Sequence, residues 1–154
     1  MNYLRTFESF SQSEIEDLRE TTKEIFSELD LEFKCEIKYN FEINIQNKRK
    51  KYLHSNIQIS IIDSLKSEER IKLIKTIIEC LERHELMCSH ETNLREISVI
   101  GGHIDTYHTK EEFLNGMGKK INFTGGNRNK IDIISIHLTT FIKNKWMPPF
   151  IKSR

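Results

Sequence analysis

Apolar and polar residues alternate without interruption over residues 31–46. Every odd position in this stretch is apolar, and every even position carries a charge or a side-chain amide. Successive side chains of a strand point to opposite faces, so the pattern predicts one long strand with a buried and a solvated face. The alternation resumes over residues 53–61 after a basic turn at residues 47–51, which predicts a hairpin.

Apolar residues at helical spacing predict two longer helices. The first lies near residues 14–29, where Ser13 and Glu16 fit a capping box. The second is expected to be capped by Ser67, to carry acidic residues in its first turn and to run to about residue 87.

The elements that follow are shorter. A third strand is expected near residues 94–107, and Gly101-Gly102 in its middle suggests a bulge or bend. A capping box of Thr109 and Glu112 then predicts a short helix.

Glycines mark the expected end of the short helix and the turn of a final hairpin. Gly116 or Gly118 is expected to end the short helix. A final hairpin is expected next, with strands near residues 119–124 and 130–142 around a turn at 125–129.

The predicted elements follow the order α-β-β-α-β-(α)-β-β. The half-buried first strand and the helix between the second and third strands predict an α+β fold, a mainly antiparallel sheet with helices on one face. A ferredoxin-like arrangement is expected in its first half. We expect a single domain over residues 13–146, preceded by a leader segment at 1–12 and followed by a basic tail at 147–154.

Composition narrows the class of protein. A chain of 154 residues with 37% hydrophobic and 31% charged residues is not a disordered tail, a collagen-like fibre or a disulfide scaffold. No apolar run approaches the ~20 residues that span a bilayer, and no secretory signal opens the chain. Cys35, Cys80 and Cys88 have no framework spacing, which indicates free thiols in a reducing, cytoplasmic compartment.

Two further features concern origin and charge. Alanine is absent and Val99 is the single valine, whereas Ile, Lys and Asn abound, which indicates an AT-rich genome such as that of a bacteriophage or a low-GC bacterium. Residues 1–33 carry nine acidic and three basic side chains, and residues 118–154 carry eight basic and one acidic. Such polarity marks either an interaction surface or charge matching between the two ends within one fold.

The opening M-N-Y-L-R-T-F-E-S-F, followed by S-E-I-E-D-L, resembles the start of many small tailed-bacteriophage accessory proteins with an M-x-x-L-x-x-F-E-x-F leader. The resemblance implies a phage origin, and it carries over no site residues because that family has no agreed activity. The leader is also similar to the short capsid-targeting leaders of internal head proteins. These likenesses imply a protein that acts in the host cytoplasm or is packaged in the phage head.

One group of residues has the chemistry of a metal site. Cys80, His84 and Cys88 lie at i, i+4 and i+8 of the second long helix, with His90 just beyond, but the spacing matches no zinc-finger signature. Cys80 also borders the apolar face of that helix, where cysteine usually acts as a small hydrophobe. We therefore expect no metal site and no cofactor.

A second group suggests phosphodiester chemistry. His137 begins an H-L-T sequence on the last strand, which has the H-x-T form of two-histidine phosphoesterases. Two such motifs on adjacent strands supply an acid and a base across a phosphate, and their hydroxyls hold its oxygens. The partner here is His54, whose H-S-N sequence lacks the hydroxyl at its third position. The alternative is a surface or half-buried histidine without a catalytic role.

A third group lies near the two central glycines. His103 and Asp105 share a face of an extended strand, with His108 nearby. A carboxylate can orient a histidine there, but no nucleophile is evident, and the alternative is a polar strand face. We expect no catalytic residue in this group.

Basic residues gather at the two predicted hairpin turns and in the tail. Clusters of this kind attract phosphates, and Trp146 or Tyr52 could stack on a base. Charged turns also protect strand edges and keep proteins soluble. The candidate partner- or nucleic-acid-binding residues are Lys48, Arg49, Lys50, Lys51, Arg128, Lys130, Lys143, Lys145 and Trp146.

The sequence favours a non-enzymatic phage accessory protein that binds and inhibits a host macromolecule. The expected partner is a host protein or ribonucleoprotein, and an anti-defence inhibitor of an RNA-guided nuclease, of the anti-CRISPR type, is one example. The acidic helix 14–30 and the basic C-terminal region are the candidate contact surfaces. Alternatives are direct nucleic-acid binding through the basic hairpins, or a two-histidine phosphoesterase. No membrane partner is expected, and the oligomeric state is open.

Overall fold

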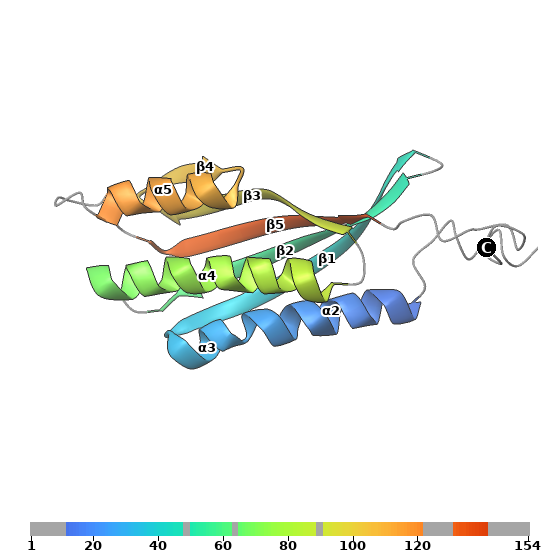
Figure 1. The fold of residues 1–154 in the computed structure, drawn as a ribbon, viewed down its shortest axis with the longest axis horizontal. Coiled ribbons are helices and arrows are strands. Elements are labelled where there is room, and N and C mark those ends of the chain that lie inside the picture. The colour runs from blue at the N-terminus through green and yellow to red at the C-terminus, as the bar shows by residue number, and fades with distance from the viewer. Residues whose placement is uncertain (1–11, 48–49, 63–64, 89–90, 122–130, 142–154) are drawn as a thin grey trace, which may run out of the picture.

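The two alternating stretches form the first two strands of a five-stranded sheet (Figure 1). The strands are β1 (Cys35–Asn47), β2 (Lys50–Ile61), β3 (Glu91–Gly101), β4 (His103–Tyr107) and β5 (Ile133–Phe141). Neighbouring strands pair antiparallel throughout, and the order across the sheet is β1-β2-β5-β3-β4. The computed structural model describes residues 12–47, 50–62, 65–88, 91–121 and 131–141.

Helices cover one face of this sheet (Figure 1). Within the described residues they are α2 (Gln12–Phe26), α3 (Glu28–Glu32), α4 (Ser67–Met87) and α5 (Lys110–Ile121). The α+β class, the antiparallel sheet and the placement of the helices on one face are therefore confirmed.

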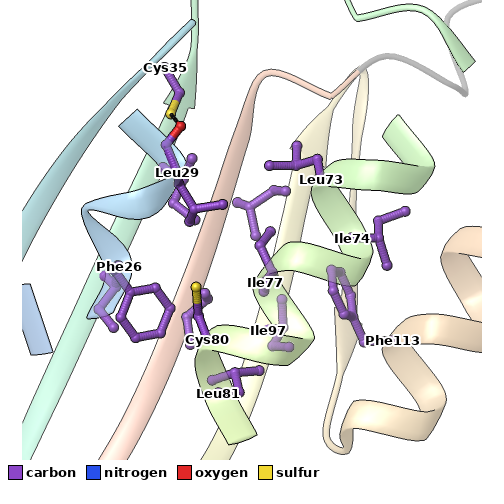
Figure 2. Packing of buried hydrophobic residues seen from close by; sticks show 14 of the residues in the cluster. Phe26, Leu29, Cys35, Leu73, Ile74, Ile77, Cys80, Leu81, Ile97 and Phe113 are labelled. Atoms are coloured by element: carbon purple, nitrogen blue, oxygen red, sulfur yellow. Dashed lines mark hydrogen bonds between the residues drawn. The ribbon is translucent and has the colours of Figure 1, made fainter. Parts of the chain in front are cut away.

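The core lies between the helices and the inner face of the sheet (Figure 2). Because strand side chains alternate, β2 points Ile57 and Ile59 at the helices, and β5 does the same with Ile134 and Ile136. Burying one such side chain stabilises the fold by roughly 1.5–3 kcal/mol. The helix residues that close this core include Phe26, Leu29, Leu73, Ile77, Cys80 and Phe113.

The strand β5 is the last described strand along the chain, yet it lies at the centre of the sheet between β2 and β3. As a consequence, β2 and β3 run parallel with β5 between them, and β4 and β5 run parallel with β3 between them. Since α4 lies between β2 and β3 in the chain and α5 between β4 and β5, these are two split β-α-β units, as in ferredoxin-like folds. The sequence predicts a ferredoxin-like arrangement in the first half of the chain, whereas both split units depend on β5 from its last part.

The predicted start of the first strand is wrong. The alternation begins at Leu31, but α3 occupies this part of the chain and β1 begins at Cys35. Phe26 and Leu29, three residues apart, are both fully buried, as expected for one face of a helix. The helical spacing therefore continues into the start of the alternating stretch, and Leu31 is 87% exposed. The predicted helix near 14–29 is accordingly split into α2 and α3.

The single strand expected near 94–107 is also wrong, because this segment is the hairpin of β3 and β4. Gly102 forms its turn at a φ of 78°, a left-handed conformation that glycine adopts without the steric cost of a Cβ. Both helices start slightly before the predicted positions. The helix predicted near residue 14 begins as α2 at Gln12, and the N-cap of α4 is Lys66 instead of Ser67. The N–H of Lys66 donates to Glu69 Oε1 over 3.3 Å.

The helix α5 continues through Gly116 and Gly118 to Ile121, so neither glycine ends it and residues 119–121 are not a strand. Gly116 instead permits a close approach, because a Cβ at this position would lie 2.2 Å from Cε1 of Tyr107. The second strand of the predicted final hairpin is confirmed as β5. Residues 122–124, the turn at 125–129, residues 1–11 of the leader and the basic tail lie outside the described residues.

Candidate functional site

His54 and His137 meet where β2 pairs with β5. In this register His54 lies opposite Thr139, and His137 lies opposite Asn56, so the two histidines are diagonal neighbours. Both point away from the helices, because the residues that precede and follow each of them in the chain are buried on the inner face. Nε2 of His54 lies 3.1 Å from Nδ1 of His137, and the two rings stack with centroids 5.2 Å apart.

Two further polar side chains extend this contact along the sheet. Ser135 precedes His137 by two residues and therefore shares its face of β5. The Ser135 hydroxyl donates to Oδ1 of Asn56 over 3.0 Å, and its oxygen lies 3.1 Å from Nε2 of His137. A continuous chain of hydrogen bonds thus runs from Asn56 through Ser135 and His137 to His54.

The histidine pair borders a hollow of about 380 Å³ on the outer face of the sheet. Three of its residues come from β2 and β5, and the others come from β3 and from the end of β4. The hollow is lined by Tyr52, His54, Arg95, Glu96, His108 and His137.

Arg95 and Glu96 reach the hollow through an irregularity in β3. Leu94 pairs with Leu138 and Glu96 pairs with His137, so Arg95 is an extra residue in the pairing of β3 with β5. A bulge of this kind re-aims side chains that strict alternation would send elsewhere. It places one positive and one negative side chain beside the histidine pair.

His108 enters the hollow from the end of β4. Its Nδ1 lies 3.4 Å from the carbonyl oxygen of Arg95. Its backbone N–H donates to Oε2 of Glu112 over 2.9 Å, and the N–H of Glu112 donates to Oγ1 of Thr109 over 3.0 Å. The predicted capping interaction of Thr109 with Glu112 is confirmed, and the start of α5 thereby fixes the backbone of a residue that lines the hollow.

The surroundings of His137 favour its neutral form. Burial lowers the pKa of His137, and the charge of His54 lowers it further. The negative charge of Glu96 raises this pKa, and the positive charge of Arg95 lowers it. The two histidines therefore do not readily carry a positive charge at the same time.

Thr139 departs from the expectation for an H-x-T motif. It lies two residues after His137, but its side chain is only 3% exposed, and its Oγ1 has no hydrogen-bond partner among the described residues. A hydroxyl buried in this way does not reach a phosphate in the hollow. The positive group available to hold a phosphate oxygen there is the Arg95 guanidinium.

Cys80 and His84 of α4 are buried, and Cys88 at the C-cap of this helix is half-buried. Sγ of Cys80 donates to the carbonyl oxygen of Ile25 over 3.6 Å, and burial raises the pKa of Cys80 to about 12. His84 is bound to Thr22, and Cys88 accepts from the Thr92 hydroxyl over 3.2 Å. In the described part of the chain, no three His, Cys, Asp or Glu side chains are placed to hold a metal ion, and His90 lies outside it.

His103 and Asp105 share a face of β4, as predicted, and Nε2 of His103 lies 2.9 Å from Oδ2 of Asp105. His108 does not join them, because it lines the hollow on the outer face of the sheet. The three residues that the sequence groups together are therefore divided between two places.

The basic residues predicted to bind a partner or nucleic acid are not placed by the structure. Lys50 and Lys51 belong to β2, and only their backbone is described. The partner-binding hypothesis thus stays a prediction. The other basic and aromatic candidates lie outside the described residues: Lys48, Arg49, Arg128, Lys130, Lys143, Lys145 and Trp146.

No motif in the sequence points to Ser135, Arg95 or Glu96. Ser135 carries a usable signal, because residues two apart on a strand share a face and it precedes His137 by two. Arg95 and Glu96 carry none, because the bulge that directs them leaves no mark in the hydrophobic pattern.

None of the described helices is long and apolar enough to cross a bilayer. No protein-family model, no curated protein and no solved structure matches this chain.

Proposed function

We propose that the histidines of this hollow catalyse the cleavage of a phosphodiester by general acid–base chemistry. The observation that carries the proposal is the approach of His54 to His137, 3.1 Å between ring nitrogens, at the edge of a hollow that also holds an arginine and a third histidine. The sequence favours a non-enzymatic binding protein, and this cluster is what argues for an enzyme.

A hydrogen bond between two imidazoles suits this chemistry because one nitrogen donates and the other accepts. The charge of His54 lowers the pKa of His137, so an added proton leaves one imidazolium beside one neutral ring. Cleavage of a phosphodiester needs a base for the attacking oxygen and an acid for the leaving oxygen. A site that holds one neutral and one protonated imidazole together supplies both.

The lining of the hollow supports a phosphate as the ligand. The Arg95 guanidinium is a permanent charge that can pair with two phosphate oxygens at once. Tyr52 offers an aromatic ring at the same place, against which a nucleoside base can stack. The proposed substrate class is therefore a nucleotide phosphodiester, either a cyclic nucleotide or single-stranded RNA or DNA.

This substrate class agrees with the expectations from the phage-like leader. A phage protein acting in the host cytoplasm meets nucleic acids and signalling nucleotides, and removal of a signalling nucleotide would be an anti-defence activity. The location in the host is part of the proposal.

The test is hydrolysis of a panel containing 2′,3′-cyclic nucleotides, cyclic dinucleotides, and short single-stranded RNA and DNA, with a metal chelator present. We expect cleavage of at least one substrate class, and a loss on the order of 10²–10⁴-fold in kcat for His54→Gln. His103→Gln is the matched control, because His103 lies outside the hollow beside Asp105. Absence of cleavage across the panel, or equal activity of His54→Gln and the control, would overturn the proposal.

A further inference from the structure

The hydrogen bonds around Ser135 have a fixed direction. A hydroxyl has one hydrogen, and that of Ser135 is given to Oδ1 of Asn56. The Ser135 oxygen can then only accept from Nε2 of His137, 3.1 Å away. His137 must therefore carry its proton on Nε2.

This direction determines the state of the neighbouring ring. With its proton on Nε2, neutral His137 has a bare Nδ1, which accepts from Nε2–H of His54 over 3.1 Å. Both ring nitrogens of His137 are then engaged, one with Ser135 and one with His54. Nδ1 of His54 is the nitrogen of the pair that lies outside this chain of hydrogen bonds.

His108 presents a second free nitrogen. A carbonyl oxygen only accepts, so Nδ1 of His108 carries the proton that it directs at the Arg95 carbonyl, 3.4 Å away. This arrangement leaves Nε2 of His108 outside that hydrogen bond. The residue lines the same hollow as His54, and its backbone is held by Glu112.

His54 and His108 come from opposite sides of the hollow. The strands β5 and β3 lie between β2, which carries His54, and β4, which leads to His108. At the usual strand spacing the backbones of β2 and β4 are about 14 Å apart. Displacement at phosphorus, with the attacking and leaving oxygens roughly in line, needs its base and its acid on opposite sides.

Building on the proposed function, we propose that His54 and His108 are the two catalytic residues that exchange protons with the phosphodiester, and that His137 is a positioning residue. The bare Nδ1 of His54 takes the proton of the attacking water or hydroxyl as its oxygen bonds to phosphorus. The bond from phosphorus to the leaving oxygen breaks, its electron pair stays on that oxygen, and Nε2–H of protonated His108 supplies the proton. Exchange with solvent restores both rings.

The assignment of base and acid follows from what each ring contacts. Once protonated, His54 donates a charge-assisted hydrogen bond to neutral His137, which stabilises the product of base catalysis. The Arg95 carbonyl accepts from Nδ1–H of His108 in both of its protonation states. The titratable or charged groups that face His137 are His54, Arg95 and Glu96. Arg95 lies beside His108, and Glu112 accepts a hydrogen bond from the backbone N–H of His108.

The first experiment reads the tautomers and needs no substrate. Long-range ¹H–¹⁵N correlation spectra of the full chain with labelled histidine distinguish a proton on Nε2 from one on Nδ1, and single His→Gln variants assign the signals. We expect neutral His137 with its proton on Nε2 and neutral His54 with its proton on Nε2. A proton on Nδ1 of neutral His137 would overturn the directed chain.

The second experiment uses the phosphodiester that the panel identifies. We expect His54→Gln and His108→Gln each to lower kcat on the order of 10²–10⁴-fold and to remove one limb of the bell-shaped pH profile. His137→Gln should lower kcat less, on the order of 10–100-fold, and keep both limbs. Ser135→Ala should also keep both limbs, and His103→Gln should match the wild type.

The outcomes separate this inference from the proposed function. If His137→Gln removes a limb while His108→Gln keeps both, the function stands and the assignment of His108 is wrong. If no phosphodiester is cleaved, the proposed function fails and the catalytic role of His108 fails with it. The measured tautomers would still show whether the hydrogen bonds are donated in the direction from His54 to Asn56.

Discussion

Thr22 of α2 and His84 of α4 meet in a buried hydrogen bond, with Oγ1 of Thr22 2.8 Å from Nε2 of His84. The Thr22 hydroxyl donates to the carbonyl oxygen of Leu18 over 2.7 Å, so the His84 ring must donate its Nε2–H. Burial lowers the pKa of His84 from 6.5 to about 4, and Glu85 opposes this only in part. His84 is therefore a neutral link between two helices.

We expect the protein to lose stability as the pH falls from about 6.5 to about 4. In this window the unfolded chain binds a proton at His84 and the folded chain does not, so the free energy of unfolding decreases, by at most on the order of 3 kcal/mol. Urea unfolding at a series of pH values measures the slope. His84→Gln lacks the titrating group and should show a shallower slope, and equal slopes in the two proteins would contradict this account.

Gly116→Ala should destabilise the protein although alanine is the better helix former. Helix propensity alone favours alanine by about 1 kcal/mol. Its Cβ would lie 2.2 Å from Cε1 of Tyr107, whose ring packs edge-on against Phe113, and overpacking of this kind costs about 1–3 kcal/mol. Denaturant unfolding gives the difference.

Two further variants separate the steric cost from helix propensity. Asn115→Ala changes an exposed position of the same helix and should be neutral or stabilising. In a Tyr107→Val background the clash is removed, so Gly116→Ala should no longer destabilise. A destabilisation of the same size in that background would show that the tyrosine is not the cause.

The three cysteines should differ in their reactivity toward an alkylating agent. Burial raises the pKa of Cys35 to about 11 and that of Cys80 to about 12. Near pH 8 about one Cys35 thiol in a thousand, and fewer at Cys80, is in the reactive thiolate form. Cys88 is only half-buried, so brief treatment with iodoacetamide followed by mass spectrometry should find it labelled first. If Cys80 were labelled as fast as Cys88 in the folded protein, Cys80 would not be buried as described. As a control, all three cysteines should react in urea.

Thr139→Val should stabilise the protein by about 1 kcal/mol, because it removes a buried hydroxyl that has no hydrogen-bond partner within the described chain. Valine has nearly the same shape and suits a strand. Thermal and denaturant unfolding measure the change. A loss of stability would mean that this hydroxyl is satisfied in the protein in solution.

The local pattern predicts most of the elements but not how they are ordered across the sheet. Alternation predicts the hairpin of β1 and β2, and helical spacing predicts α4, because each depends on residues close in sequence. Nothing local indicates that β5 inserts between β2 and β3, since strand order depends on pairing between distant segments. Gly116 shows the same limit, because its role depends on Tyr107 and not on its own helix.

The sequence also predicts only part of the candidate site. His54 and His137 can be named as a pair from their motifs, because both stand on predicted strands. Their contact required the register of β2 with β5, in which His137 lies opposite Asn56. The approach of His108 and Arg95 depended on the β3 bulge and on the hairpin turn at Gly102, neither of which the periodicity of apolar residues reveals.

The central position of β5 has a consequence for the order in which this protein folds. The hairpins β1-β2 and β3-β4 close locally, but they have no strand pairing with each other until β5 joins them. The bond between His54 and His137 spans 83 residues of chain, and closing such distant contacts is slow compared with forming helices or hairpins. A molecule that has not docked β5 can therefore be rich in secondary structure and still lack the histidine cluster. During refolding, the circular dichroism signal of the helices should recover before the hollow forms. Any activity should appear only with the final, slow phase.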